Sequence, residues 1–359
     1  MLPKWYDKWV SDNPKDIYGP AILIGAVGGA VLVAALLVTW GRPLPVEAVQ
    51  TGPRGTGMSV TKFVSDRATP DPTAAAYASV APVVPQPGDP TALTAVPGAE
   101  PALGDLTAAN YERLVNQMRE WTGIPDLFAG EENYQTVVAR TMIRMTQNLN
   151  ENWDGHVNLS GEAGVNCFTC HRGQPVPTGV WFKITPVNKA TAGWASVQNR
   201  TTVLSGSTSL PSDALEKYLL DGETIAVHDL ESRVAQNVTD GSSPTWQNAE
   251  RTFSLMNYFD NALGVNCVFC HNSRAFYDPG QNTPQWATAQ LGIGMVQELN
   301  VDYMTPLQDV LPPERLGAQG DVPKIGCQTC HKGYQKPLGG MDMVSDWPEL
   351  RASGEPVYQ

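Results

Sequence analysis

Three pentapeptides decide how this chain of 359 residues is interpreted: Cys167-Phe-Thr-Cys170-His171, Cys267-Val-Phe-Cys270-His271 and Cys327-Gln-Thr-Cys330-His331. Together they contain all six cysteines. The pattern C-x-x-C-H is the attachment signal of c-type haem, in which the two thiols bond to the haem and the adjacent histidine binds the iron. A structural zinc site needs four ligands and usually combines two C-x-x-C units, which is a different arrangement. The cysteines therefore predict three covalently bound haem c groups and no metal besides iron.

The overall composition limits the kinds of partner. The chain has 24 Lys and Arg against 36 Asp and Glu, a net charge of −12, which excludes nucleic acid and favours a basic protein partner. A hydrophobic content of 42% is sufficient for a packed core. The 33 Gly and 29 Pro residues predict many turns and loops.

Four segments carry apolar residues at three- and four-residue spacing, which predicts helices over residues 110–121, 134–150, 249–263 and 286–300. Gly123, Gly164 and Gly264 follow such runs, where a left-handed residue is expected to end the helix. The predicted fold class is therefore mainly α: a multihaem cytochrome c with short helices and long loops around haems that form much of its core.

An internal repeat organises these helices. Residues 144–153 (RMTQNLNENW) and 294–303 (GMVQELNVDY) share Met, Gln, Leu and Asn in register at an offset of 150, so the chain contains two pseudo-repeats. A haem motif follows each of these helices. The second half carries an additional motif at Cys267, whereas the first half reads TGIPDLFAGEENY over residues 122–134, without Cys or His. This difference indicates that a fourth haem site has been lost.

The N-terminus contains a membrane signal. Residues 17–41 hold no charged side chain, and the apolar run reaches the roughly 20 residues that a transmembrane helix needs. A cleaved secretory signal is the alternative, but this run is longer than the usual apolar region of about 7–15 residues. We therefore expect a cytoplasmic N-terminus over residues 1–19 and a retained transmembrane helix over residues 20–41. Because c-type haem is attached outside the bacterial cytoplasm, the chain after the anchor is expected to be periplasmic.

Residues 42–105 form a Pro- and Ala-rich segment, with eight prolines between Thr69 and Leu103. Proline lacks a backbone donor and favours an extended path, so this segment is expected to be a strap that links the anchor to the periplasmic triheme domain, residues 106–359. Plain disorder and a strap laid over a partner are both compatible with its composition.

Each iron needs a second axial ligand or remains open for chemistry. Outside the motifs, the candidates are His156, His228 and ten methionines. Met256 lies 11 residues before the second motif, on the helix that leads to it. Met142 and Met145 share a helix face, so one can bind iron while the other packs, and the residues alone do not decide which. His156 is the candidate for a bis-histidine haem, whereas His228 is expected to be structural or solvated.

At this point a resemblance becomes specific. The runs VVARTMIRMTQNLNENWDGHV and GVNCFTCHRGQPVP, the run NALGVNCVFCHNSRAF with its downstream TPQ, and the run GDVPKIGCQTCHKGYQKPLGG resemble the cytochrome subunit of purple-bacterial photosynthetic reaction centres. The similarity covers roughly residues 110–343. Members of that family usually carry four haems, and this chain resembles the triheme variety. Many relatives are lipoproteins held by an N-terminal cysteine, which is absent here, so the hydrophobic helix is expected to replace it.

The resemblance implies the iron ligands and the function. It pairs His171 with Met142, His271 with Met256, and His331 with His156, and so selects Met142 over Met145. It implies a subunit, not an enzyme, on the periplasmic face of the inner photosynthetic membrane. That subunit takes electrons from a soluble cytochrome c or high-potential iron-sulfur protein and reduces the photo-oxidised bacteriochlorophyll pair. The implied partners are the L, M and H subunits and the light-harvesting 1 ring.

Two rival functions share the haem motifs. One is a membrane-anchored cytochrome that serves a periplasmic reductase, and the other is a multihaem reductase with one open iron. The residues also suggest where a soluble donor docks. The resemblance implies that the first haem of the four-haem relatives receives the electron, so without that motif entry is expected at the Cys167 haem. Asp126, Glu131 and Glu132 lie nearest to the lost motif in sequence, and their carboxylates would attract a basic carrier.

Overall fold

The structure is a computed structural model. It describes residues 3–12, 19–39, 46–50, 59–63, 71–89, 103–158 except 105, 163–184, parts of 196–225, 246–354 except 277, and 356–358. His228 lies outside these residues, as do 90–102 of the predicted strap. The chain forms two compact units, one made mainly of the first 48 residues and one that contains residues 69–359.

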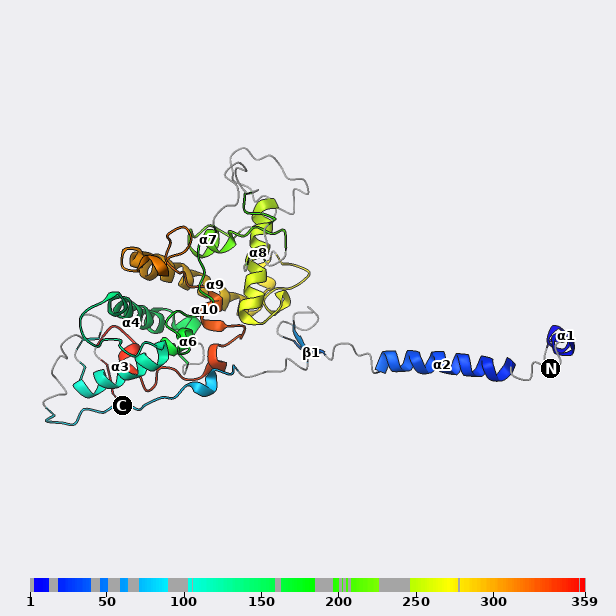
Figure 1. The fold of residues 1–359 in the computed structure, drawn as a ribbon, viewed down its shortest axis with the longest axis horizontal. Coiled ribbons are helices and arrows are strands. Elements are labelled where there is room, and N and C mark those ends of the chain that lie inside the picture. Colours follow the sequence, from blue (N-terminus) through cyan, green and yellow to red (C-terminus); the bar gives the residue numbers. More distant parts are fainter. Residues whose placement is uncertain are drawn as a thin grey trace. The chain divides into compact units, whose positions relative to one another are not determined.

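The first unit contains two helices, α1 (Lys4–Asp12) and α2 (Gly19–Thr39) (Figure 1). The 21 residues of α2 carry no charge, and within the described residues this is the helix long and apolar enough to cross a membrane. It overlaps the span predicted over residues 20–41. After α2, the strands β1 (Val46–Gln50) and β2 (Ser59–Phe63) pair in a small sheet that the sequence analysis did not predict.

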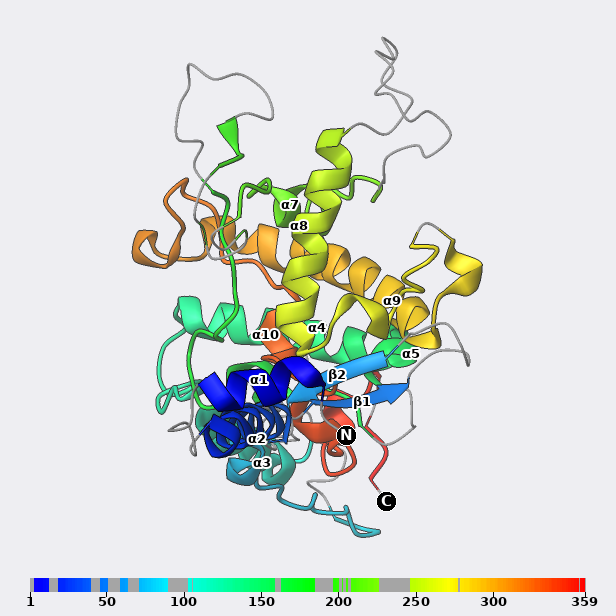
Figure 2. The same ribbon diagram turned by 90° about the vertical axis from the view of Figure 1, so that its right-hand side faces the viewer.

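The second unit is mainly helical, as predicted. Its α-helices are α3 (Ala108–Thr122), α4 (Tyr134–Asn152), α5 (Asp154–Val157), α6 (Cys167–His171), α7 (Ala214–Leu219), α8 (Trp246–Leu263), α9 (Pro284–Glu298) and α10 (Cys327–His331). A π-helical turn, Leu299–Met304, continues α9, and short 3₁₀ helices are at Ala74–Ala76, Cys267–Phe269, Pro279–Gln281, Thr305–Asp309, Pro313–Arg315, Pro337–Gly340 and Pro348–Leu350. All four predicted helices are present. In Figure 2, α7 lies beside α8.

Helix ends follow from capping residues. The Thr107 and Asn133 side chains accept hydrogen bonds from backbone N–H groups in the first turns of α3 and α4, at 3.2 Å and 3.1 Å. Gly123 and Gly264 end α3 and α8 with φ of 63° and 61°, as predicted. Gly164 is also left-handed, with φ of 62°, but it lies in the loop before α6, so the prediction that it ends a helix is wrong.

The two pseudo-repeats are visible as equivalent contacts between helices and motifs. Gly173, two residues after the first motif, donates its N–H to the Trp121 carbonyl at 2.8 Å. Gly333, two residues after the third motif, donates to the Ala262 carbonyl at 2.8 Å. Each contact lies at the end of a helix, so α3 supports α6 in the same way as α8 supports α10.

A second pair of contacts repeats around two asparagines. The Asn150 side chain donates to the Val165 carbonyl and accepts from the Val165 N–H, both at 2.8 Å. The Asn300 side chain does the same with Ile325, at 2.9 Å and 2.7 Å. Both bonded segments lead directly into a haem motif. The repeat in the sequence therefore reflects a repeated device that fixes the backbone two residues before a motif.

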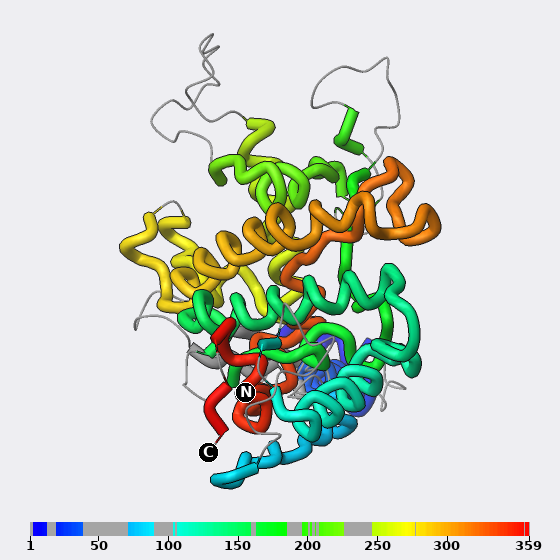
Figure 3. Tube along the Cα trace, turned by 90° about the vertical axis from the view of Figure 1, so that its left-hand side faces the viewer, coloured from blue at the N-terminus to red at the C-terminus, as the bar shows by residue number. Residues whose placement is uncertain are grey.

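The halves meet at equivalent residues, which happens where a local twofold axis relates them. The helix α4 runs beside α9 and its π-helical continuation (Figures 1 and 3), and Asn148 donates to the Glu298 carboxylate at 2.5 Å across an offset of 150. The motif helices α6 and α10 also meet, at Cys170 and Cys330. The first and third motifs are therefore neighbours.

The longest described stretch of the predicted strap, residues 71–89, lies on the chain's own helices. The strands β1 and β2 belong to the same predicted segment, residues 42–105. The Asn110 side chain of α3 makes two hydrogen bonds of 2.9 Å with the backbone of Val83. The Tyr77 ring lies 5.4 Å from the Phe168 ring, and its hydroxyl accepts a hydrogen bond from Asn166 at 3.0 Å. Asp71 pairs with Arg172 directly after the first motif, and both side chains are only 4% exposed. Residues 71–89 are thus bound to the domain that contains the motifs. The sequence alone is compatible with plain disorder or with a strap laid over a partner.

Candidate haem centre

The first and third motifs form nearly identical short helices. In both, the hydroxyl of the motif threonine, Thr169 or Thr329, accepts the N–H of the residue before the first cysteine, at 3.1 Å and 3.0 Å. In both, the residue after the histidine is left-handed, with φ of 51° at Arg172 and 52° at Lys332. The chain then turns back over the histidine, which sets the orientation of the imidazole.

Three of the four described histidines use Nδ1 in the same way. His171 and His331 contact the carbonyl oxygen three residues further on, of Gln174 at 2.8 Å and of Tyr334 at 2.9 Å. His156, in α5, contacts the Thr288 carbonyl of α9 at 3.0 Å. A carbonyl only accepts, so each Nδ1 carries the proton and each Nε2 keeps the lone pair that binds a metal.

His156 and His331 face each other although 175 positions separate them in the chain. Their ring centroids are 6.2 Å apart and the ring planes are inclined by 67°. Two metal–imidazole bonds of about 2 Å, together with two half rings, span about 6 Å, so this spacing fits one metal ion between the rings. The structure therefore brings together the two histidines that the resemblance pairs.

Burial keeps these imidazoles neutral, which is the form that binds iron. It lowers the pKa of His331 to about 4, while the Tyr334 carbonyl opposes that lowering. Burial also lowers the pKa of His156, of His171 and of His271. At neutral pH all four histidines are therefore free of the proton that would compete with a metal.

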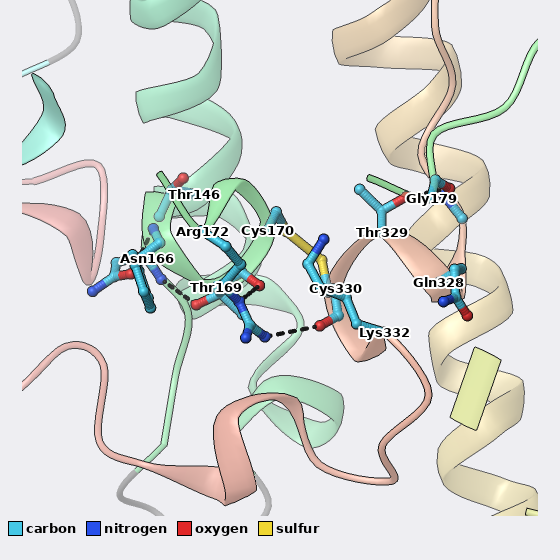
Figure 4. Close-up of a disulfide and its surroundings, with 12 residues drawn as sticks. Thr146, Asn166, Thr169, Cys170, Arg172, Gly179, Gln328, Thr329, Cys330 and Lys332 are labelled. Atoms are coloured by element: carbon cyan, nitrogen blue, oxygen red, sulfur yellow. Dashed lines mark hydrogen bonds between the residues drawn. A yellow bond between two sulfur atoms is a disulfide. The ribbon is translucent and has the colours of Figure 1, made fainter. Parts of the chain in front are cut away.

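The cysteines are held as protonated thiols or as a disulfide. Burial raises the pKa of Cys167 and of Cys327 to about 12, and that of Cys270 to about 11. Cys170 and Cys330 are bonded to each other, with their Cα atoms 4.5 Å apart (Figure 4). A disulfide sulfur cannot also form a thioether to haem, so the predicted attachment at these two residues requires both as free thiols. Their closeness agrees with the contact between α6 and α10.

The second motif is built differently. Cys267–Phe269 is a 3₁₀ turn, and the Cys267 thiol donates to the Asp260 carboxylate at 3.3 Å. The His271 ring lies 5.5 Å from the exposed ring of Phe276. Burial first, and then the Asp260 charge, raise the pKa of Cys267. This motif also lacks the left-handed residue that directly follows the histidine in the other two motifs.

The two candidate methionine ligands are half-buried in apolar surroundings. Met142 packs against a cluster that contains Met145 and Leu299. Met256 packs against another cluster, which Cys327 of the third motif also contacts. Met145 is itself a buried member of the core.

Several functional contacts were not visible in the sequence. Arg172, directly after the first motif, donates hydrogen bonds to the Asp71 carboxylate at 2.5 Å and to the Thr73 hydroxyl. The basic Lys332 contacts Thr178 instead, at 2.8 Å. The register of the repeat could have indicated Asn150 and Asn300, which occupy equivalent positions, but nothing in the sequence links Asp71 with Arg172.

Comparison with known proteins gives concordant results. Residues 41–351 match the family described as photosynthetic reaction centre cytochrome C subunit. The photosynthetic reaction center cytochrome c subunit of Roseobacter denitrificans is 56% identical over 372 aligned residues that cover 100% of both chains. The corresponding subunit of Rubrivivax gelatinosus is 38% identical and covers 92% of this chain and 90% of its own, and that of Thermochromatium tepidum is 36% identical over 69% and 62%.

Proposed function

Because the chain belongs to the family of photosynthetic reaction-centre cytochrome c subunits, we propose that it donates electrons to the bacteriochlorophyll pair through three haems, one on each motif. Donation of electrons to this pair is the role of the family, and the subunit is an electron-transfer protein and not an enzyme. Both rival functions are set aside on this ground. The number of haems, their ligands and the soluble donor are our proposal.

The proposed attachment uses every cysteine of the chain. The thioether residues would be Cys167, Cys170, Cys267, Cys270, Cys327 and Cys330, and the axial pairs would be His171 with Met142, His271 with Met256, and His331 with His156. The single observation that carries this proposal is the pairing of the His156 and His331 rings at 6.2 Å, with Nδ1 of each bound to a carbonyl. Residues that merely filled a core would not need two neutral imidazoles with their lone pairs available.

When bound, the haems supply the reversible one-electron chemistry of iron. The chain's own residues set how readily each site accepts an electron. A thioether is a weaker donor to ferric iron than an imidazole, so methionine raises the potential relative to histidine. The site of His331 and His156 is therefore expected to have the lowest potential of the three.

The proposal for membrane attachment rests on α2, which would cross the inner photosynthetic membrane once and leave residues 42–359 in the periplasm. The expected partners are the L, M and H subunits of the reaction centre and the light-harvesting 1 ring. The net charge of −12 supports a basic soluble cytochrome c, or a high-potential iron-sulfur protein, as the donor.

Three measurements test this proposal. The mass of the denatured subunit should exceed the mass of the polypeptide by three haem increments, and any other number would contradict it. A disulfide between Cys170 and Cys330 in the native protein would leave only the second motif with both thiols free, and mapping of thioether peptides would detect this. The subunit should also purify with bacteriochlorophyll-bearing proteins.

A further inference from the structure

In the second motif, Nδ1 of the histidine is not bound to the carbonyl three residues further on, as it is in the other two motifs. In those motifs the left-handed residues Arg172 and Lys332 turn the chain so that a carbonyl returns to the histidine. After His271, none of the described residues 272–276 has positive φ. The Nδ1 atom of His271 is buried without a hydrogen-bond partner.

A second buried atom in the same region also lacks a partner. It is Oδ1 of Asn282, an amide oxygen that can only accept a hydrogen bond. A buried polar atom without a partner destabilises the folded protein, so a buried donor and a buried acceptor that both lack partners indicate a bond that forms when the site is filled. His271 Nδ1–H is the donor that this oxygen lacks.

The backbone holds Asn282 beside the motif. The next residue, Thr283, donates its N–H to the Cys270 carbonyl at 3.1 Å and its hydroxyl to the Phe269 carbonyl at 2.9 Å. Thr283 is only 3% exposed and also begins α9. The two hydrogen bonds of Thr283 therefore hold the adjacent residue, Asn282, next to the second motif.

We propose that the Asn282 side chain accepts the Nδ1–H of His271 and so orients this imidazole toward its iron. The inference rests on the proposed function, because it requires a haem on the second motif. Within the described part of the chain, the two groups that lie close enough to act on the His271 imidazole are the Asn282 side chain and the Phe276 carbonyl. Asn282 is thus a positioning residue, which acts on the haem through the histidine.

At the second motif the proposed acceptor is a side chain, which a substitution can change. At the other two motifs the acceptor is a backbone carbonyl, which a substitution leaves in place. A carboxylate accepts more strongly than an amide, because a charge-assisted hydrogen bond is roughly twice as strong as a neutral one. A stronger acceptor makes the imidazole a better donor to the iron and stabilises its ferric form. The Asn282→Asp variant should therefore lower the potential of the second-motif haem, and Asn282→Ala should raise it.

The test is a redox titration of the three haems in purified reaction centres, for the parent, Asn282→Asp and Asn282→Ala. The matched control is Gln281→Ala. Gln281 lies in the same loop and binds Asn272 and Asp278, so this variant disturbs the loop without removing the proposed acceptor. The expected result is opposite shifts of one haem in the two Asn282 variants, with all three haems unchanged in the control.

Two other results would overturn the inference. If both Asn282 variants titrate like the parent, or shift in the same direction as Gln281→Ala, then the Phe276 carbonyl or water is the acceptor. If the parent lacks a haem on the second motif, as measured by peptide mass, the proposed function fails at that motif and the inference fails with it. The mass measurement thus separates the two failures.

Discussion

The contact between Gly264 and Gly333 gives the sharpest prediction about stability. A Cβ atom on Gly264 would lie 2.1 Å from the Gly333 carbonyl oxygen, and φ of Gly264 is +61°. Gly264→Ala therefore has two separate costs. The left-handed backbone costs an ordinary residue about 1–2 kcal/mol. Forcing α8 away from the third motif adds about 1–3 kcal/mol of overpacking and about 1 kcal/mol for the lost Gly333–Ala262 hydrogen bond.

The control for this variant is Gly222→Ala. Gly222 has a similar φ of +68°, but a Cβ atom there meets nothing within 4 Å. It should lose only the backbone part, about 1–2 kcal/mol, whereas Gly264→Ala should lose about 3–6 kcal/mol. The assay is denaturant unfolding of the purified subunit, followed by haem absorbance and circular dichroism. Equal losses in both variants would refute the argument that this close approach holds the motif on α8.

Three further predictions concern the haem sites and the strap. Met256→His should lower the potential of one haem, because imidazole is the stronger donor to ferric iron, and a titration that overlays the parent would exclude Met256 as a ligand. Asp71→Asn should expose residues 72–89 to proteolysis at acidic pH just above 3.8, where the parent keeps the strap contact. In the parent, burial raises the pKa of Asp71, but hydrogen bonds from Thr73 and Arg172 outweigh burial and lower this pKa below its ordinary 3.8. The contact between Asp71 and Arg172 is therefore complete above pH 3.8, and it is lost as the pH falls through the lower pKa that Asp71 has in the folded protein. Pepsin digestion across an acidic pH series, with the exposed Asp126→Asn as control, measures this, and a strap that is equally resistant in parent and Asp71→Asn would contradict it. Charge reversal at Glu131 should slow association with a basic soluble donor at low salt more than reversal at Glu132, because Arg140 already pairs with Glu132; equal ionic-strength slopes for both variants and the parent in flash kinetics would exclude this loop.

The sequence predicted the long helices well because each carries several turns of apolar residues at regular spacing. The helices α5 and α7, of four and six residues, are too short to show that spacing. The motifs themselves indicated which residues could bind haem. The contacts that support the motifs could not be predicted from the sequence, because bonds such as Asp71–Arg172 join positions 101 apart and depend on how the chain folds back.

The first half of the chain lacks a counterpart of the motif at Cys267, and the residues that stand there instead bear on how the protein can evolve. When the two halves are aligned on Gly123 and Gly264, an offset of 141, the positions of Met256, Cys267, Cys270 and His271 correspond to Val115, Asp126, Ala129 and Gly130. Val115 and the neighbouring Leu127 are now buried, and Leu127 belongs to a core with Trp121 and Trp347. Restoring a haem there would need four simultaneous ligand substitutions and the removal of a packed core. A substitution at the buried Val115 alone would destabilise the protein, so the present packing opposes the return of a haem at this position.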